Sequence, residues 1–227
     1  MEKIRLENVT LIGIDCVNIE QLVAVSEICT KFIEFGAVKL LSSQPSECPY
    51  VLKIPPITRI EDYGPFVIKE LYKYIDTEYM LTIQNDGFIL NPFAWSDDFL
   101  MYDYIGAPWW YNDEFNVGNG GFSLRSKRLM ERVALDPHIE VCHPEDNAIC
   151  RIYGGYLREK GFKFPSDDEA YRFSVEKEVW DGQFGFHGAD IRGWDIYKYA
   201  DRERHAKYID LFFDLCSKTE AKEKSRI

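Results

Sequence analysis

The sequence predicts an α/β fold, with a mostly parallel central sheet and helices on both of its faces. Apolar residues in the first third of the chain alternate between strand and helix periodicity in the order β-α-β-β-α-β. Of the 227 residues, 46% are hydrophobic and 15% aromatic, which is enough to bury one sizeable core. We find no internal repeat and no linker-like stretch, and we therefore expect a single domain.

The first predicted strand covers residues 9–14 and stops at Asp15. Apolar positions at helical spacing predict a helix over residues 19–35, with Gly36 where a C-terminal cap belongs. Two further strands over residues 37–41 and 50–54, and a second helix over residues 63–75, complete the alternating pattern.

The fold is predicted to centre on Tyr79–Ile83, a run of aromatic, aliphatic and β-branched residues typical of a buried strand. The run ends at Gln84-Asn-Asp-Gly87, which is typical of a plain turn. Strand ends of this kind also bind ligands in open α/β sheets. Gln84 and Asp86 would point the same way in extended chain, so Asp86 could bind Mg²⁺ or Mn²⁺ beside Gln84 as a hydrogen-bonding partner.

The second half of the chain is predicted to hold shorter elements. They are a short helix near Asp97–Met101, a strand over residues 104–107, a helix capped by Ser126 and running to Ala134, a helix over residues 147–160, and strands over residues 162–164 and 172–175. A charged tail follows from Lys218.

Two motifs in this half could contribute to a site. Residues 118–121 contain three glycines, which would let a ligand approach the backbone, although a bulge or tight turn is the alternative. Glu145 and Asp146 follow Pro144 where a helix begins. Acidic residues favour a first helical turn through the helix dipole, and a carboxylate held there could also serve as a general base.

His187 stands between Gly185 and Gly188 in an aromatic segment, so it could be a metal ligand or a structural histidine. A strand-end carboxylate, a glycine-lined strand, a carboxylate pair at a helix start and a late histidine together favour metal-assisted transfer from a nucleotide sugar. In such a reaction the cation offsets the charge of the leaving diphosphate and a carboxylate activates the acceptor hydroxyl.

The formal charge of −11 argues against nucleic-acid partners and against binding to anionic lipid. The six cysteines form no Cys-x-x-Cys unit, and we interpret them as reduced thiols of a cytoplasmic protein. Neither a signal peptide nor an apolar run of membrane-spanning length is apparent, so no transmembrane segment is expected.

Several segments resemble a family of uncharacterised bacterial glycosyltransferase domains, which is described as a domain of unknown function and is similar to the GT-A glycosyltransferases. The resembling segments are residues 81–92, 102–109, 117–125, 144–146 and 184–188, in that order. The resemblance implies a single GT-A-like domain over residues 1–217, with a nucleotide-binding half to about residue 90, an acceptor-binding half from about residue 91, and a flexible tail over residues 218–227.

The resemblance also implies roles for individual residues. The GT-A Asp-x-Asp motif corresponds to Gln84-Asn85-Asp86, where only the second acid is kept, so Asp86 would bind Mn²⁺ or Mg²⁺ together with His187. The remaining implied roles are Asp146 as the base of an inverting reaction, Asp15, Gln84 and Asn85 as nucleotide-binding residues, and Trp109, Trp110, Gly120, Gly121 and Glu145 as sugar- or acceptor-binding residues.

The expected activity is hexosyl transfer from a UDP- or dTDP-sugar to a hydroxyl of a glycan or similar acceptor, in polysaccharide biosynthesis. A nucleotidyltransferase is one alternative, although Asp15-Cys-Val-Asn18 lacks the basic, glycine-rich loop that would hold a triphosphate. A non-catalytic carbohydrate-binding module is the other, with Trp95, Trp109, Trp110 and Trp194 as stacking platforms.

Overall fold

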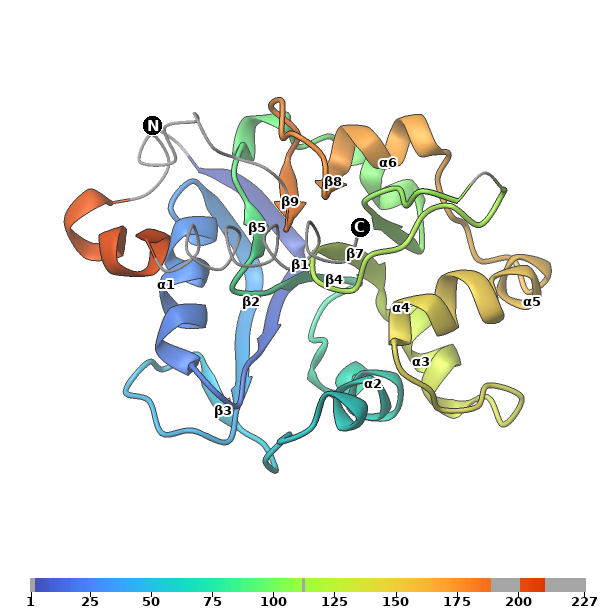
Figure 1. Cartoon of the computed structure of the whole chain (residues 1–227), viewed down its shortest axis with the longest axis horizontal. Coiled ribbons are helices and arrows are strands. Elements are labelled where there is room, and N and C mark those ends of the chain that lie inside the picture. The colour runs from blue at the N-terminus through green and yellow to red at the C-terminus, as the bar shows by residue number, and fades with distance from the viewer. Residues whose placement is uncertain (1–2, 112, 189–200, 211–227) are drawn as a thin grey trace, which may run out of the picture.

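A six-stranded sheet forms the centre of the molecule (Figure 1). The computed structural model describes residues 3–111, 113–188 and 201–210, so Trp194 and the predicted tail from Lys218 lie outside the described residues. The strands lie in the order β3 (Val51–Lys53), β2 (Ile33–Ser42), β1 (Ile4–Ile14), β4 (Tyr79–Ile83), β7 (Ser123–Ser126) and β6 (Tyr104–Gly106). The first four pair in parallel, and β7 runs antiparallel to both of its neighbours.

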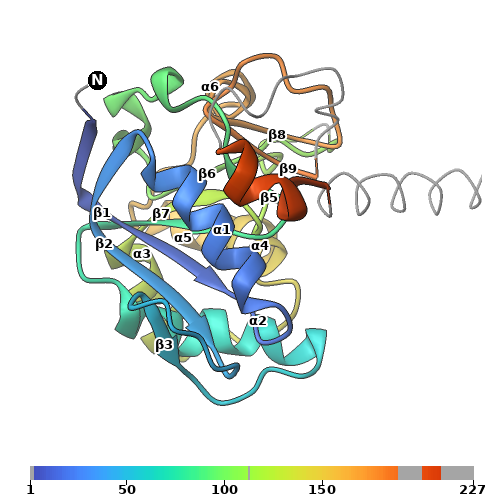
Figure 2. The ribbon, with the colours of Figure 1, turned by 90° about the vertical axis from the view of Figure 1, so that its left-hand side faces the viewer.

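Helices cover both faces of this sheet, which confirms the predicted α/β class. Helix α1 (Ile19–Thr30) lies over one face, and α2 (Ile60–Lys69) and α3 (Lys127–Leu135) lie over the other (Figures 1 and 2). Side chains of β1 alternate between the two faces, with Leu11 in the hydrophobic cluster beside α1 and Ile12 in the cluster beside α2 and α3.

A second, three-stranded sheet lies on the α1 side, and its order is β5 (Gly87–Ile89), β9 (Gly185–His187) and β8 (Ser174–Glu176). The chain enters β5 only four residues after β4, because Gln84 and Gly87 exchange backbone hydrogen bonds across a tight turn. The end of the central strand β4 therefore leads at once into β5, which pairs with β9, the strand that carries His187.

The remaining elements are short. They are 3₁₀ turns at Leu71–Tyr74, Pro92–Ala94 and Asp97–Met101, helix α4 (Glu145–Asn147) continued by a π-helical turn at Ala148–Ile152, α5 (Gly154–Glu159) and α6 (Asp167–Phe173). Residues 202–210 form a helical segment beside α1, where Arg204 and His205 pair with Glu27 (Figure 2).

The predicted helix over residues 19–35 extends too far. Helix α1 ends at Thr30, and Ile33 pairs with Ile4 as the start of β2. Gly36 is part of that strand and is not a helix cap. A Cβ there would lie 2.0 Å from the backbone oxygen of Glu7, so only glycine allows this close approach of β1 and β2.

Two predicted strands of the second half are also wrong in part. Residues 162–164 form no strand, and of residues 172–175 only Ser174 and Val175 belong to one. The preceding residues form α6, which begins with a capping box between Ser166 and Glu169. Ser-x-x-Glu is the sequence signature of such a start.

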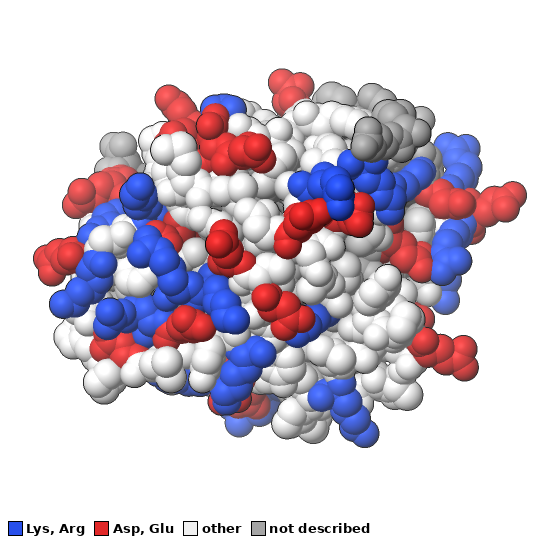
Figure 3. All heavy atoms as spheres, turned by 180° about the vertical axis from the view of Figure 1, so that it is seen from behind, with Lys and Arg blue, Asp and Glu red and all other residues white. Residues whose placement is uncertain are grey.

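Charge is unevenly distributed over the surface. Seen from behind, Lys and Arg side chains gather toward the side of the molecule that carries α3 and α5 (Figure 3). Two of the α3 guanidiniums are paired, Arg128 with Asp103 and Arg132 with Asp136. The first pair links α3 to the loop before β6, and the second lies at the C-terminal end of α3 itself.

No helix among residues 3–111, 113–188 and 201–210 is long and apolar enough to cross a membrane.

The loop before β6 supplies a test of this packing. Asp103 is 3% exposed and accepts hydrogen bonds from Ser126 Oγ at 2.6 Å, Arg128 Nε at 2.6 Å and the Lys163 backbone N–H at 2.9 Å. We expect Asp103→Ala to lower the free energy of unfolding by about 2–3 kcal/mol, because the buried Ser126 hydroxyl and two further donors lose their shared, buried acceptor. Urea unfolding measures the change, and exposed Asp98→Ala should shift stability by less than about 0.5 kcal/mol.

Candidate functional site

The loops after β1 and β4 meet at the carboxyl edge of the sheet. Asp15 Oδ1 accepts hydrogen bonds from the backbone N–H groups of Val17 (2.6 Å) and Asn18 (2.7 Å). Its other oxygen accepts from Asn85 Nδ2 at 2.5 Å. The structure therefore brings together two of the predicted nucleotide-binding residues, which are 70 positions apart in the sequence. The third, Gln84, donates from Nε2 to the Tyr63 hydroxyl at 3.2 Å.

Asp86 lies within the turn that follows β4 and faces His187. The antiparallel pairing of β5 with β9 places Gly87 opposite His187, and the Gly188 N–H donates to the Asp86 backbone oxygen at 2.8 Å. As a result, Asp86 Oδ1 lies 3.5 Å from His187 Nε2. The two predicted metal ligands are thus neighbours, and both the turn and the ligand interpretations of Asp86 are compatible with its position.

His187 has a second acidic neighbour. Its Nδ1 lies 3.2 Å from Glu176 Oε1, on β8. Burial opposes the charge of the imidazole, but hydrogen bonds with Asp86 and Glu176 outweigh it and raise the pKa of His187 to about 10. Burial also acts to raise the pKa of Asp86, yet hydrogen bonding to His187 holds it below its usual value. Without a bound metal ion, the histidine is therefore an imidazolium between two carboxylates, and its Nε2 must release its proton before it can bind a cation.

The Asp86–His187 pair can fit one divalent cation. A single ion could bind both Asp86 Oδ1 and His187 Nε2, because two metal–ligand bonds of about 2.1 Å can span their separation of 3.5 Å. Carboxylate oxygen and imidazole nitrogen are both common metal ligands. Among the described residues, no group of three or more His, Cys, Asp or Glu side chains is arranged to hold a metal ion. A cation at this pair would therefore need further oxygen ligands from water or from a bound substrate.

The glycines before β7 make room for the side chains of the site. A Cβ at Gly120 would lie 2.4 Å from Glu145 Oε1, and one at Gly121 would lie 2.2 Å from His187 Nε2. Asn119, with φ of 74°, shapes this loop because its Oδ1 accepts from the Gly121 and Phe122 N–H groups. The glycines thus allow acidic and histidine side chains to pack against the backbone.

Asp146 lies at the start of α4 with both oxygens hydrogen-bonded. The Gly120 N–H donates to Oδ2 at 2.9 Å, and the Asn147 N–H donates to Oδ1 at 2.8 Å. Burial first, and then the negative charge of Glu145, raise the pKa of Asp146 above its usual value, although the two N–H groups and Arg125 act in the opposite direction. A carboxylate with a raised pKa is suited to general base catalysis near neutral pH.

The neighbouring Glu145 is only 3% exposed and pairs with a fully buried guanidinium. Arg125 Nη2 lies 3.2 Å from Glu145 Oε1, and the guanidinium stacks over the Tyr104 ring at 4.9 Å. Arg125 was not a sequence-based candidate. It lies in the segment Ser123–Ser126, where the polar residues on either side give no sign that the arginine is buried.

Most of these groups line one cavity of about 200 Å³. Its walls include Gln84, Gly120, Gly121, Glu145, Asp146 and His187 from the sequence-based set, together with Tyr63, Asn119, His143 and Glu176. Tyr63 and Glu176 were missed because no local pattern distinguishes them from surface residues. The cavity lining does not include Asp15, Asn85 or Asp86. Asp86 contacts the lining residue His187, and Asp15 is hydrogen-bonded to Asn85, which follows the lining residue Gln84.

The two predicted tryptophans lie outside this cavity lining. Trp109 packs against the backbone at Gly118, where a Cβ would lie 2.0 Å from the indole ring. Trp110 is 67% exposed, and Lys177 Nζ lies 4.8 Å from its ring centre. Trp110 is therefore the more accessible of the two rings.

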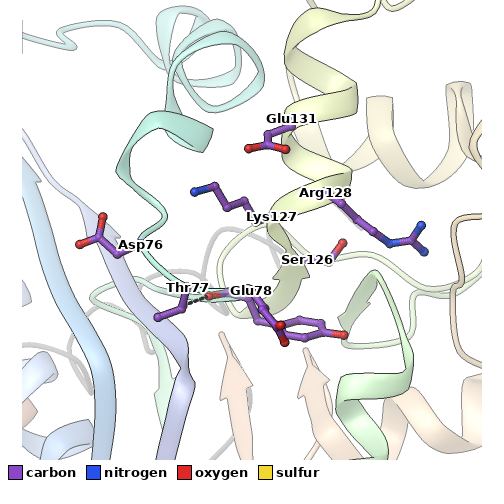
Figure 4. A pocket seen from close by; sticks show the side chains of 8 residues that line it. Asp76, Thr77, Glu78, Ser126, Lys127, Arg128 and Glu131 are labelled. Atoms are coloured by element: carbon purple, nitrogen blue, oxygen red, sulfur yellow. Dashed lines mark hydrogen bonds between the residues drawn. The ribbon is translucent and has the colours of Figure 1, made fainter.

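A larger pocket of about 550 Å³ lies at the opposite end of β4, beside the start of α3 (Figure 4). Lys127 and the carboxylates of Asp76, Glu78 and Glu131 surround it, and none of the sequence-based candidates is among its lining residues. Ligands of open α/β sheets bind at the carboxyl ends of strands, which favours the smaller cavity as the candidate site.

The His187 pair gives a prediction for the metal-free protein. Glu176→Gln should lower the pKa of His187 from about 10 toward its usual value of 6.5, because one of two acceptors loses its charge. In the wild type, the stabilising effect of this pairing is complete below pH 6.5 and is lost as the pH rises through about 10. NMR titration of the ring nitrogens measures the shift, and an unchanged value would show that Glu176 does not hold the proton on His187.

Three solved structures that are similar to this chain are glycosyltransferases. The apo-form glycosyltransferase GlyE of Streptococcus pneumoniae aligns with a TM-score of 0.45 and 8% identity, over 95% of this chain and 64% of its own. The galactosyltransferase LgtC, in complex with donor and acceptor sugar analogues, aligns with a TM-score of 0.44 and 11% identity, over 87% of this chain and 95% of its own. A second structure of GlyE gives 0.42 and 10%, with the same coverage as the first. This chain thus spans less than two thirds of the GlyE chain.

No curated protein matches the sequence. The family described as "Protein of unknown function (DUF5672)" matches residues 51–187, from β3 through β9. This match spans more than half of the chain and includes the turn after β4, the glycine-rich loop, Asp146 and His187. The chain belongs to the DUF5672 family.

Proposed function

We propose that this protein is a GT-A-like glycosyltransferase that moves a sugar from a UDP- or dTDP-sugar to a hydroxyl of a glycan or similar acceptor, by a metal-assisted, inverting reaction. One observation carries the proposal. A carboxylate with a raised pKa, Asp146, lines the same small cavity as His187, whose Nε2 is paired with the strand-end carboxylate Asp86. A general base and a cation-binding pair are the two devices that this transfer requires.

The donor half of the site is supported by the residues after β1 and β4. Asp86 and His187 would hold Mn²⁺ or Mg²⁺, which supplies positive charge to offset the leaving diphosphate. The buried Oδ1 of Asn85 has no hydrogen-bond partner among the described residues. Uracil and thymine each carry one imide N–H that could donate to it, which supports a uridine or thymidine donor with Asp15 and Gln84 nearby.

On the acceptor side, Asp146 would take the proton of the attacking hydroxyl. The acceptor oxygen then bonds to the anomeric carbon as the bond from that carbon to the diphosphate oxygen breaks. The nucleoside diphosphate leaves with the electron pair, and direct displacement inverts the configuration. Gly120 and Asn147 fix the carboxylate through their N–H groups, so its orientation is set before the substrate binds. Glu145 at the cavity wall and the exposed ring of Trp110 would contact the acceptor, with Trp109 as the support behind.

The nucleotidyltransferase alternative is less well supported. Such an enzyme needs free backbone N–H groups after its first strand to hold a triphosphate. Here the Val17 and Asn18 N–H groups both donate hydrogen bonds to Asp15 Oδ1, so they are not available to a phosphate.

The carbohydrate-binding alternative is also less well supported among the described residues. Trp110 is the one described tryptophan that is strongly exposed, since Trp109 packs on Gly118 and Trp95 packs against Phe99 and Phe184. The cytoplasmic location and the part in polysaccharide biosynthesis remain predictions from the sequence.

The role of Asp146 is tested by substitution. Asp146→Asn should keep nucleotide affinity within about twofold but lower turnover about 10²- to 10⁴-fold, because the amide cannot accept the hydroxyl proton. Calorimetry with UDP and Mn²⁺ measures the first quantity, and hydrolysis or transfer of a UDP-sugar measures the second. Asp168→Asn, in the first turn of α6 and exposed, is the matched control and should change neither. Unchanged turnover in Asp146→Asn would remove this residue from the role of base.

The metal interpretation of Asp86 gives a second prediction. Asp86→Ala should weaken UDP binding about tenfold or more in the presence of Mn²⁺ and should have little effect in EDTA, because the cation links this carboxylate to the diphosphate. Titrations in the two buffers measure the difference, with Asp98→Ala as an exposed control. Equal losses with and without metal would mean that Asp86 acts only by holding the turn and His187.

A further inference from the structure

Arg125 is a charged side chain placed entirely inside the protein. It is 0% exposed on β7, and its Nε donates to Ser123 Oγ at 3.0 Å. Its Nη1 has no hydrogen-bond partner among the described residues. Burial acts to lower the pKa of this guanidinium, but neighbouring groups, Tyr104 and Glu145 first among them, raise it above its usual value, so Arg125 stays charged. Buried charges of this kind contribute little to stability and need another explanation.

The guanidinium contacts two neighbours of Asp146, Gly120 and Glu145. Nη2 donates to the Gly120 carbonyl oxygen at 3.3 Å and to Glu145 Oε1 at 3.2 Å. Gly120 in turn donates its N–H to Asp146 Oδ2 at 2.9 Å, and Glu145 precedes Asp146 in the chain. A single nitrogen of Arg125 therefore holds Gly120 of the glycine-rich loop and Glu145 of α4, and both of these residues adjoin Asp146.

The same contacts matter electrostatically. Glu145 and Asp146 are adjacent carboxylates in a partly desolvated cavity, and two such groups compete for one proton unless a cation balances them. Arg125 is the cation that faces Asp146 from β7. The other titratable groups around Asp146 are Glu145 on α4, Tyr63 on α2, Tyr104 on β6, Cys150 in the π-helical turn, and His143, Glu176 and His187 across the cavity.

We propose that Arg125 is a positioning residue for the transfer reaction, which holds Gly120 and Glu145 so that Asp146 is ionised and correctly oriented toward the acceptor. This inference rests on the proposed function. It differs from a purely structural role, in which Arg125 would affect folding and leave the protonation of Asp146 unchanged.

Two substitutions separate charge from geometry. Arg125→Met removes the charge at similar length, and Arg125→Lys keeps the charge but cannot reproduce the planar contacts. For Arg125→Met, we expect UDP affinity with Mn²⁺ to stay within about twofold, kcat to fall about 10- to 100-fold, and the acid limb of the pH–rate profile to move to higher pH. Arg125→Lys should lower kcat as well, with the acid limb close to that of the wild type.

A direct readout does not depend on activity. The ¹³C NMR titration of the Asp146 carboxyl, assigned with Asp146→Asn, should show a higher midpoint in Arg125→Met than in the wild type. If Arg125→Met is too unstable to titrate, combining it with Glu145→Gln removes both charges of the pair. The Asp146 midpoint of this double variant should lie above that of the single Glu145→Gln variant, which keeps Arg125. An equal or lower midpoint in the variant that lacks Arg125 would overturn the proposal.

The proposed function and this inference fail in different ways. A wild type that neither binds UDP or dTDP nor turns over a donor sugar contradicts the proposed function, and with it the role of Arg125 in transfer. Suppose instead that the wild type is active and that Arg125→Met loses stability and turnover in parallel. If its pH profile and its Asp146 midpoint are then unchanged, the positioning role alone is contradicted.

Discussion

The buried Arg125–Glu145 ion pair is the interaction on which the candidate site depends. A guanidinium without solvent contact must be balanced by nearby acceptors, and here these are Glu145, the Gly120 carbonyl and the Ser123 hydroxyl. Glu145 can approach because residue 120 is glycine. The pair thereby ties β7, the glycine-rich loop and the start of α4 together, and leaves Asp146 at the junction of all three.

The direction of β7 makes this junction possible. Because β7 is antiparallel to β4, the glycine-rich loop that precedes it lies at the same edge of the sheet as the ends of β1 and β4. The second sheet reaches that edge from the other side, where the pairing of β5 with β9 sets His187 beside Asp86. Segments that are far apart in the sequence, from Tyr63 on α2 to His187 on β9, therefore line one cavity, in which donor and acceptor functions can act together.

The sequence predicts the elements whose signals are local. Tyr79–Ile83 is a strand, Asp97–Met101 a short helical turn and Ser126 a helix cap, as expected from β-branched content and capping chemistry. The end of α1 was not predictable in this way, because Ile33 continues the helical spacing and becomes a strand only through pairing with Ile4. Arg125 and Glu176 were missed for the same reason, since only tertiary contacts place them beside Asp146 and His187.

The most direct test of the account is a crystal structure of the protein with UDP and Mn²⁺. It should show the cation bound to Asp86 and His187, the diphosphate on that cation, and Asp146 facing the side of the cavity where an acceptor would enter. A nucleotide bound at another surface, or a cation that contacts neither Asp86 nor His187, would contradict the proposed site.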